Sequence, residues 1–153
     1  MRTGCQQGYN RRMNKVCELG RKWSPYILSI MRIVIAVLFT CHGTQKIFGY
    51  PSTHFERPAL TSWFGIGGII ETIGGTLVLF GLFTRCASFV LSGEMAVAYF
   101  KYHATRGPWW PIHNMGEPAV VYCFVFLYLW AAGGGPWSLD SLLFGKRDGP
   151  PST

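Results

Sequence analysis

Residues 65–82 read GIGGIIETIGGTLVLFGL, an apolar stretch close to bilayer length that carries Glu71 near its middle. Gly67, Gly74 and Gly75 lie on the same helical face as that glutamate, because steps of three and four residues return to one side of a helix. A charge that faces lipid at this depth costs at least about 2.5–3.5 kcal/mol. The stretch therefore predicts a membrane helix whose acid faces a bundle interior, with glycines that allow close helix packing.

Composition places the whole chain in the membrane class. Charged residues make up 14% of the 153 residues, whereas soluble domains carry about 25%. The net charge of +7 does not indicate nucleic-acid binding, because no such motif or basic–aromatic stripe is present. Instead, six basic residues precede the first apolar run, as expected of a cytoplasmic flank. They are Arg2, Arg11, Arg12, Lys15, Arg21 and Lys22.

Four apolar stretches are each close to the roughly 20 residues that a spanning helix needs. They run from about 25–45, 60–82, 86–104 and 117–132. The first is too long for a signal peptide and no A-x-A-like site follows it, so it is interpreted as an uncleaved span. We therefore predict an all-α, integral membrane four-helix bundle over residues 25–134. A basic tail at 1–24 precedes it, and a segment at 135–153 with a short amphipathic turn and a disordered tail follows.

The distribution of Lys and Arg predicts that both termini are cytoplasmic. The predicted inner side holds the six tail residues together with Arg85, Lys146 and Arg147, and the outer loops hold Lys46, Arg57, Lys101 and Arg106. Tryptophan prefers the two membrane interfaces. All the tryptophans fall at predicted span ends, namely Trp23, Trp130 and Trp137 inside and Trp63, Trp109 and Trp110 outside.

Three charged residues fall within the predicted spans. Arg32, Glu94 and Glu71 lie roughly 10, 12 and 16 Å from the inner ends of their spans, so we expect them to meet in a buried polar cluster. Two glutamates share one arginine, which predicts that one acid keeps a proton or that both share one. Lys46 is about 20 Å further out than Arg32 and is expected to be too distant to help. The cluster either fixes helix register or forms a proton or ligand site, and both interpretations remain open.

A second polar cluster is expected at the outer face, formed by His42, Lys46, His103, His113 and Glu117. Its spacing is irregular and contains no H-x-x-E or H-x-x-x-H unit, so a metal site is disfavoured. Haem b is disfavoured as well, since no histidines lie at mid-membrane on facing helices. The residues are expected to hydrogen-bond the loops over the bundle mouth or to meet a quinone headgroup.

The five cysteines contain no C-x-x-C pair, so no zinc knuckle or thiol-redox pair is encoded locally. Cys5 and Cys17 lie in the predicted cytoplasmic tail and are expected to be reduced. Cys41 and Cys123 both belong to the predicted outer half of the bilayer. A disulfide between them is possible there, and two buried free thiols are favoured.

The order of several motifs along the chain resembles the DoxX family of small four-helix bacterial inner-membrane proteins. These motifs are Arg32, G-x-x-K (Gly43, Lys46), Glu71, GLFTR (81–85), GEMAVAYF (93–100), NMGE (114–117) and GGGPWSLD (133–140). The resemblance covers about residues 25–143. It implies a multi-pass fold in the bacterial inner membrane. The family is related to subunits of quinol oxidase and of thiosulfate:quinone oxidoreductase, which implies a quinone link without assigning a reaction.

Three functions are compatible with these features. The first is an accessory subunit of a membrane redox or respiratory complex, because the chain carries no redox centre or catalytic motif and no covalent cofactor is expected. The second is a small proton-coupled transporter or channel that uses the buried acids, although no internal repeat is present. The third is a structural subunit that shields a larger complex. The expected partners are the lipid bilayer and a membrane protein or a second copy, and nucleic acid is not among them.

Overall fold

The computed structural model describes residues 3–50 and 58–145, with side chains from residue 14 onward. Every regular element in these residues is a helix, so the predicted all-α class is confirmed. The elements are α1 (Thr3–Phe48), α2 (Trp63–Phe80), α3 (Thr84–Ala98), the π-helical turn η1 (Tyr99–His103), α4 (Glu117–Ala132) and α5 (Leu139–Leu143). Residues 51–57, in the loop predicted to be outside, and the predicted disordered tail from residue 146 lie outside the described residues.

The helix that contains the first apolar stretch is much longer than the predicted span. It begins at Thr3 and passes through Pro25 without a break. Proline removes one backbone hydrogen bond and disfavours the helix interior, yet α1 continues for 22 residues before Pro25. The prediction for the last apolar stretch matches α4 at both ends. The short turn predicted after it is confirmed as α5, whose Ser138 side chain accepts a hydrogen bond from Ser141 N.

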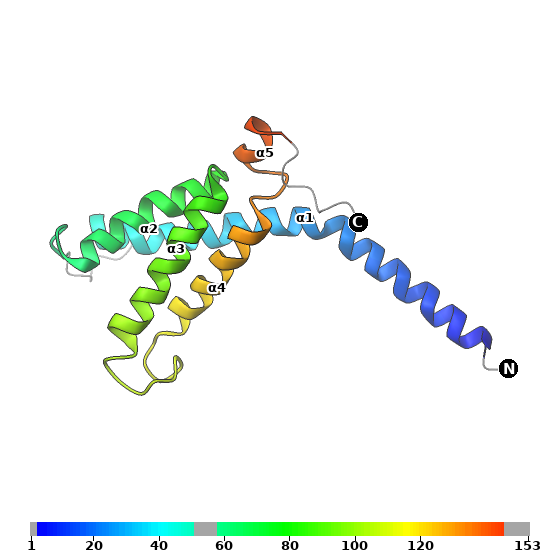
Figure 1. Cartoon of the computed structure of the whole chain (residues 1–153), viewed down its shortest axis with the longest axis horizontal. Coiled ribbons are helices and arrows are strands. Elements are labelled where there is room, and N and C mark those ends of the chain that lie inside the picture. Colours follow the sequence, from blue (N-terminus) through cyan, green and yellow to red (C-terminus); the bar gives the residue numbers. More distant parts are fainter. Residues whose placement is uncertain (1–2, 51–57, 146–153) are drawn as a thin grey trace.

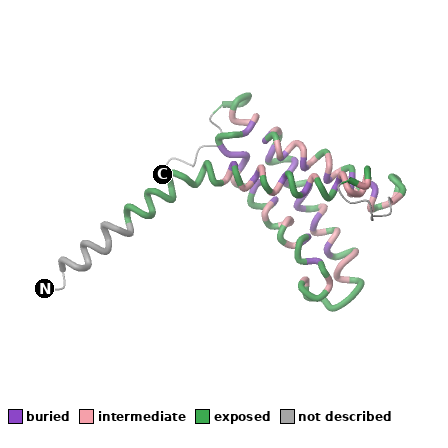
Figure 2. Tube along the Cα trace, turned by 180° about the vertical axis from the view of Figure 1, so that it is seen from behind, coloured by how far each residue is buried: buried purple, intermediate pink, exposed green. Residues whose placement is uncertain are grey.

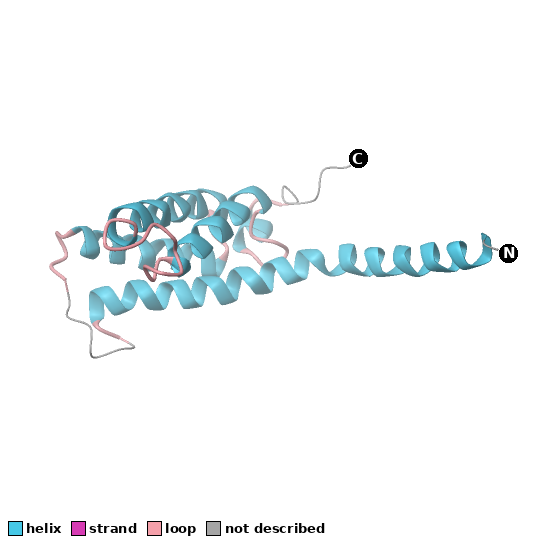
Figure 3. Cartoon of the chain, turned by 90° about the horizontal axis from the view of Figure 1, so that it is seen from below, coloured by secondary structure: helices cyan, strands magenta, loops and turns pink. Residues whose placement is uncertain are grey.

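The helices form two antiparallel hairpins. α1 and α2 lie side by side, and α3 and α4 form a second pair that slants across the first (Figure 1). α1 runs along one side of the molecule and extends well beyond the other helices (Figure 3). The α2–α3 connection is made by the tight turn at Gly81, which has a left-handed φ of 68° and donates its N–H to the end of α2.

The interior of the bundle is more polar than a soluble core, and its surface is more apolar. Fully buried polar or charged side chains come from α1, α2, α3 and the segment before α5: Ser29, Arg32, Glu71, Thr84, Ser88 and Ser138. Large apolar residues instead face outward along each of the four long helices, for example Val34, Ile73, Val90 and Phe124. Figure 2 shows the buried positions distributed through the bundle, whereas the described part of α1 that projects from it is exposed. Lipid around the bundle accounts for this pattern.

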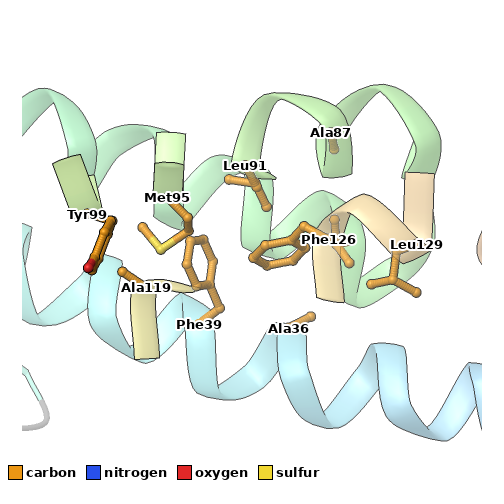
Figure 4. Packing of buried hydrophobic residues seen from close by; sticks show 10 residues of the cluster. Ala36, Phe39, Ala87, Leu91, Met95, Tyr99, Ala119, Phe126 and Leu129 are labelled. Carbon is orange, nitrogen blue, oxygen red and sulfur yellow. The ribbon is translucent and has the colours of Figure 1, made fainter. Parts of the chain in front are cut away.

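A compact apolar layer joins the two hairpins. Phe39 of α1 meets Phe126 of α4 edge to face, with ring centroids 4.7 Å apart, and Met95 and Leu91 of α3 lie above them (Figure 4). Edge-to-face pairs of this kind are favourable beyond the area that they bury. This layer fixes how α3 and α4 sit on α1.

Small residues line the contact between α1 and α2. A Cβ atom added to Gly43 would lie 2.6 Å from the Thr72 backbone nitrogen, and one added to Gly75 would collide with Thr40. Of the predicted packing glycines, Gly75 therefore faces α1, whereas Gly74 faces Leu91 and Gly67 faces Glu94 on α3. Glycine lets two helix backbones approach closely. Gly43 and Gly75 thus hold α1 and α2 in one fixed register.

We expect Gly43→Ala to destabilise the protein by about 1–3 kcal/mol, because the methyl group cannot fit without moving α2. Gly93→Ala is the matched control, since a Cβ there meets nothing within 4 Å. Alanine at that position should be neutral or stabilising by about 0.5–1 kcal/mol through helix propensity. Thermal unfolding of both variants in the same detergent makes the comparison. Equal effects of the two substitutions would contradict the close α1–α2 contact.

Candidate functional site

Arg32 is fully buried and donates to four backbone carbonyls. Its Nε donates to Gly134 O at 2.8 Å, its Nη2 donates to Trp137 O at 2.7 Å, and its Nη1 donates to two oxygens at the end of α2. Those two oxygens belong to Val78 and Leu79, each at 2.5 Å. Carbonyls in the last turn of a helix have no partner within that helix. The guanidinium therefore supplies a donor to Leu79 O and a second donor to Val78 O, which also accepts from Gly81 N.

This placement corrects the predicted cluster of Arg32, Glu71 and Glu94. The antiparallel pairing sets Arg32 beside Val78 and sets Gly43 beside Thr72. Seven residues of α2 separate Val78 from Glu71, which corresponds to about 10 Å along the helix. The arginine therefore binds backbone at one end of the bundle, and neither acid reaches it.

Asp140 completes the same end of the molecule. Its two carboxylate oxygens accept hydrogen bonds from Phe83 N at 2.7 Å and Thr84 N at 2.8 Å, where α3 begins. A carboxylate at a helix N-terminus satisfies free N–H groups and interacts favourably with the helix dipole. Sequence reasoning did not assign a role to Asp140. The signal was present in the motifs GLFTR and GGGPWSLD, which the structure brings into contact here.

Replacing Arg32 with lysine should destabilise the protein strongly. An ammonium group cannot reach four carbonyls in two separate segments, so at least two charge-assisted hydrogen bonds are lost, at about 1.5–3 kcal/mol each. We expect the Tm in detergent to fall by about 6–24 °C on this basis. The conservative change Arg21→Lys at an exposed position of the same helix is the control. A stable Arg32→Lys variant would show that the four carbonyls do not depend on the guanidinium.

Glu71 pairs with Lys46, against the expectation that Lys46 lies too far out. Lys46 Nζ lies 2.5 Å from Glu71 Oε1, and the side chains are 21% and 2% exposed. The close contact at Gly43 places Glu71 opposite the last turns of α1, within reach of the lysine stem. Depths counted along each span separately do not contain the stagger of α1 relative to α2. The expected distance between Lys46 and Glu71 was wrong for this reason.

Glu94 lies near the Lys46–Glu71 pair, and its charge interacts with both of these residues. Its carboxyl is within electrostatic range of Glu71 and Lys46. The second oxygen of each acid, Oε2, is buried and has no hydrogen-bond partner. Two acids therefore still share one cation, which is Lys46 in place of Arg32. That one acid of the two retains a proton remains a prediction.

A cavity of about 290 Å³ opens beside these three charged groups. All four long helices contribute to its wall, which is mostly apolar and aromatic apart from the charged residues. The apolar and aromatic side chains are Phe39, Trp63, Phe64, Met95, Ala98, Tyr102, Met115, Pro118, Ala119 and Tyr122. Trp63 is an expected interface residue, and Met95, Ala98 and Met115 fall within the motifs GEMAVAYF and NMGE. The sequence carries no signal for the other residues, because their spacing also fits ordinary packing.

The predicted outer-face cluster divides into two parts. His42, Lys46 and His103 line the cavity, and His103 Nδ1 lies 3.1 Å from the carbonyl oxygen of Asn114. His113 and Glu117 are exposed and do not line it. Glu117 begins α4, where a negative charge favours the helix N-terminus. The cluster is thus a cavity wall with two residues that belong to the connecting loop and the start of α4.

The part of the chain with described side chains contains neither a metal-binding cluster nor a disulfide. No group of three His, Cys, Asp or Glu residues there is arranged to hold a metal ion. Cys17, Cys41, Cys86 and Cys123 are free thiols. Cys41 and Cys123 are unpaired, as favoured, but neither is buried: Cys41 is exposed and Cys123 is half-buried.

The ion pair of Lys46 and Glu71 should show strong coupling in a double-mutant cycle. Removing one partner of a buried pair costs about 3–5 kcal/mol, because a charge is left without compensation. We therefore expect Lys46→Met and Glu71→Gln each to lower the Tm, and the double variant to recover much of the loss. Thermal unfolding of the four proteins measures the coupling. Additive losses would contradict a direct pair.

The apolar surface and the buried charges define a helical membrane protein with a ligand-sized cavity at one end. The family model described as DoxX matches residues 27–104, and the chain belongs to this family. It is 42% identical to an uncharacterized protein of Haemophilus influenzae over 82% of this chain and 96% of that protein.

Two further relatives have more descriptive names. The inner membrane protein YqjF of Escherichia coli is 28% identical over 74% of this chain and 89% of its own length. A Bacillus subtilis protein, named as a candidate oxidoreductase, CatD, is 29% identical over 90% of this chain and 97% of its own length. No solved structure matches the chain.

Proposed function

We propose that this DoxX-family protein crosses the inner membrane four times, with both termini in the cytoplasm, and serves as a subunit of a redox complex that handles a quinone. The cavity beside Lys46, Glu71 and Glu94 is the proposed site for the quinone headgroup. The observation that carries the proposal is a mostly apolar cavity that contains two buried acid oxygens without partners.

The lengths of the helices and the exposed apolar side chains on their outer faces support four spans. Residues 14–48 of α1 and all of α2 are long and apolar enough to cross a membrane. α3 and η1 together form a helical run from 84 to 103, which is about 30 Å long. α4 is a shorter apolar helix that packs antiparallel to α3, with Arg85 donating to Trp130 O and Ala131 O. α3 and α4 thus form a pair similar in depth to α1 and α2.

The cavity suits a small planar ring with polar substituents. Its volume of about 290 Å³ falls at the lower end of ligand pockets, which range over about 300–1,000 Å³. Such pockets combine apolar and aromatic walls with a few polar groups that fix orientation. Phe64 and Tyr122 supply flat surfaces from opposite hairpins, and the three charged groups supply orientation.

The charged groups match both oxidation states of a quinone. Lys46 has three N–H donors and uses one on Glu71, so it can donate to a quinone carbonyl. The free oxygens of Glu71 and Glu94 can accept hydrogen bonds from quinol hydroxyls. Oxidation of a quinol releases two electrons and two protons; the one ionised acid of the pair would take up one proton, the second proton would pass to water at the open side of the cavity, and the partner protein would take up both electrons. The oxidoreductase name of the Bacillus subtilis relative fits this role.

The proposal predicts that quinone co-purifies with the protein and is lost when the cavity is filled. The protein is isolated from its native membrane in mild detergent, and bound quinone is extracted and quantified alongside the co-purifying proteins. Ala98→Trp places an indole in the cavity wall. We expect it to reduce bound quinone at least about tenfold, which corresponds to about 1.4 kcal/mol. The matched control is Val97→Trp, one residue away on the lipid-facing surface.

The outcomes separate the parts of the proposal. Bound quinone that is lost in Ala98→Trp and kept in Val97→Trp supports the cavity site. A wild-type protein without quinone, or equal loss in both variants, would refute that site. Stable partner proteins without quinone would favour a structural subunit instead.

A proton-coupled transporter is the second candidate, because two buried acids share one lysine at a cavity. Glu94 is the acid without an ion-pair partner in the described residues, so it is the better candidate for a mobile proton. Purified protein in liposomes would then carry a proton flux that Glu94→Gln abolishes. Liposomes without measurable flux would remove this candidate.

A further inference from the structure

The part of α1 that precedes Pro25 projects away from the bundle (Figures 1 and 2). Residues 14–24 are all exposed. They nevertheless carry three large apolar side chains, Val16, Leu19 and Trp23, which are 66%, 58% and 52% exposed. Spacings of three and four residues place these side chains on one face of the helix. Contiguous exposed apolar side chains of this kind mark a surface that contacts a membrane or another molecule.

The stripe continues the face of α1 that meets lipid in the span. Ile27, Ile30 and Val34 are exposed on the bundle surface, and they follow Trp23 by four, seven and eleven residues, which are steps that return to the same helical face. The end of the span is marked by Trp23 and Tyr26, whose ring centroids are 6.0 Å apart. Aromatic residues of this kind favour the membrane interface. One uninterrupted apolar face therefore passes from the span into the projecting segment.

Pro25 lies at the junction and on the opposite side of the helix. Two residues turn the helix by about 200°, so Pro25 and Trp23 point in nearly opposite directions. The bundle lies on the proline side, since Gly135 packs against the Pro25 carbonyl. A proline ring clashes with the carbonyl four residues earlier and opens the helix on its own side. The helix therefore bends most easily toward the face that carries the apolar stripe.

We propose that the segment of α1 before Pro25 is an interfacial anchor that lies on a bilayer surface rich in anionic phospholipid. A bend at Pro25 toward the lipid-facing side turns Val16, Leu19 and Trp23 down into the bilayer. Lys15 and Lys22 then flank the stripe at the level of the phosphates. Basic residues beside an apolar face are the pattern of helices that lie in the membrane interface.

Lipid fits the segment better than a protein groove or a second copy. The stripe is continuous with a surface that lipid already covers, and the proline directs the bend toward that same surface. The charge of the flanking lysines is complementary to anionic headgroups. None of these features requires a partner chain.

Full-length protein in nanodiscs tests the proposal. The native cysteines are replaced, and a nitroxide label is attached at Leu19→Cys or at Glu18→Cys, on the water-facing side. Collision rates with oxygen and with a water-soluble nickel complex report the depth of each label. With phosphatidylglycerol present, we expect several-fold lower nickel collision at position 19 than at 18. This difference should shrink in pure phosphatidylcholine, at high salt and in Lys15→Glu/Lys22→Glu, and persist in Lys15→Arg/Lys22→Arg.

Hydrogen exchange of the unmodified protein provides a second readout that does not depend on the cysteine replacements. The amides of residues 14–22 should exchange more slowly in phosphatidylglycerol nanodiscs than in phosphatidylcholine nanodiscs. Equal nickel access at positions 18 and 19 would mean that the helix projects into water, and it would overturn the proposal. Protection that is independent of lipid charge would also overturn it, as would protection that appears only with two copies per nanodisc.

Discussion

The Arg32 guanidinium donates to backbone carbonyls at the end of α2 and in the segment between α4 and α5. No other described side chain makes hydrogen bonds to both of these regions. In a low-dielectric interior a charge is tolerated only when its hydrogen-bonding capacity is satisfied. The carbonyls at a helix end have the same need for a donor. Arg32 and the two segments that it contacts therefore stabilise one another. The charged residues at the opposite end of the bundle do not take part in this contact.

At that opposite end the balance of charges is incomplete. Lys46 pairs with Glu71, while Glu94 contributes a second acid beside the same cavity. A structural ion pair would need neither the additional acid nor the cavity. Glycines make this arrangement geometrically possible, because only backbones as close as those at Gly43 bring a residue of α2 within reach of Lys46. Packing and the proposed chemistry thus depend on the same small residues.

Membership of the DoxX family and the apolar surface agree on the environment of the chain. Serine, threonine and charged side chains lie inside the bundle beside its apolar layer, and large apolar side chains cover its outside. A soluble protein has the opposite arrangement at its surface. The projecting part of α1 is the exception, because its apolar stripe lies beyond the bundle. The proposed contact with the bilayer surface accounts for an apolar face that continues from the bundle back to Val16.

Local sequence was sufficient for several elements. The apolar run from Glu117 to Ala132 specified α4, and Ser138 with the residues after it specified α5. The cost of burying a charge was sufficient to predict that Arg32 and Glu71 face the interior, and both are buried. These features depend on residues close together in the chain or on the solvent around a single helix, so the sequence contains the necessary information.

The partners of those charges were decided only in the tertiary structure. Arg32 was expected to bind acids and binds carbonyls, while Lys46 was expected to be distant and binds Glu71. The distance between two side chains on different helices depends on the stagger of those helices. Stagger is set by close contacts such as Gly43 with Thr72 and by the capping of helix ends, which involve residues far apart in sequence. The sequence determined which residues are buried, and the packing of α1 against α2 determined which of them meet.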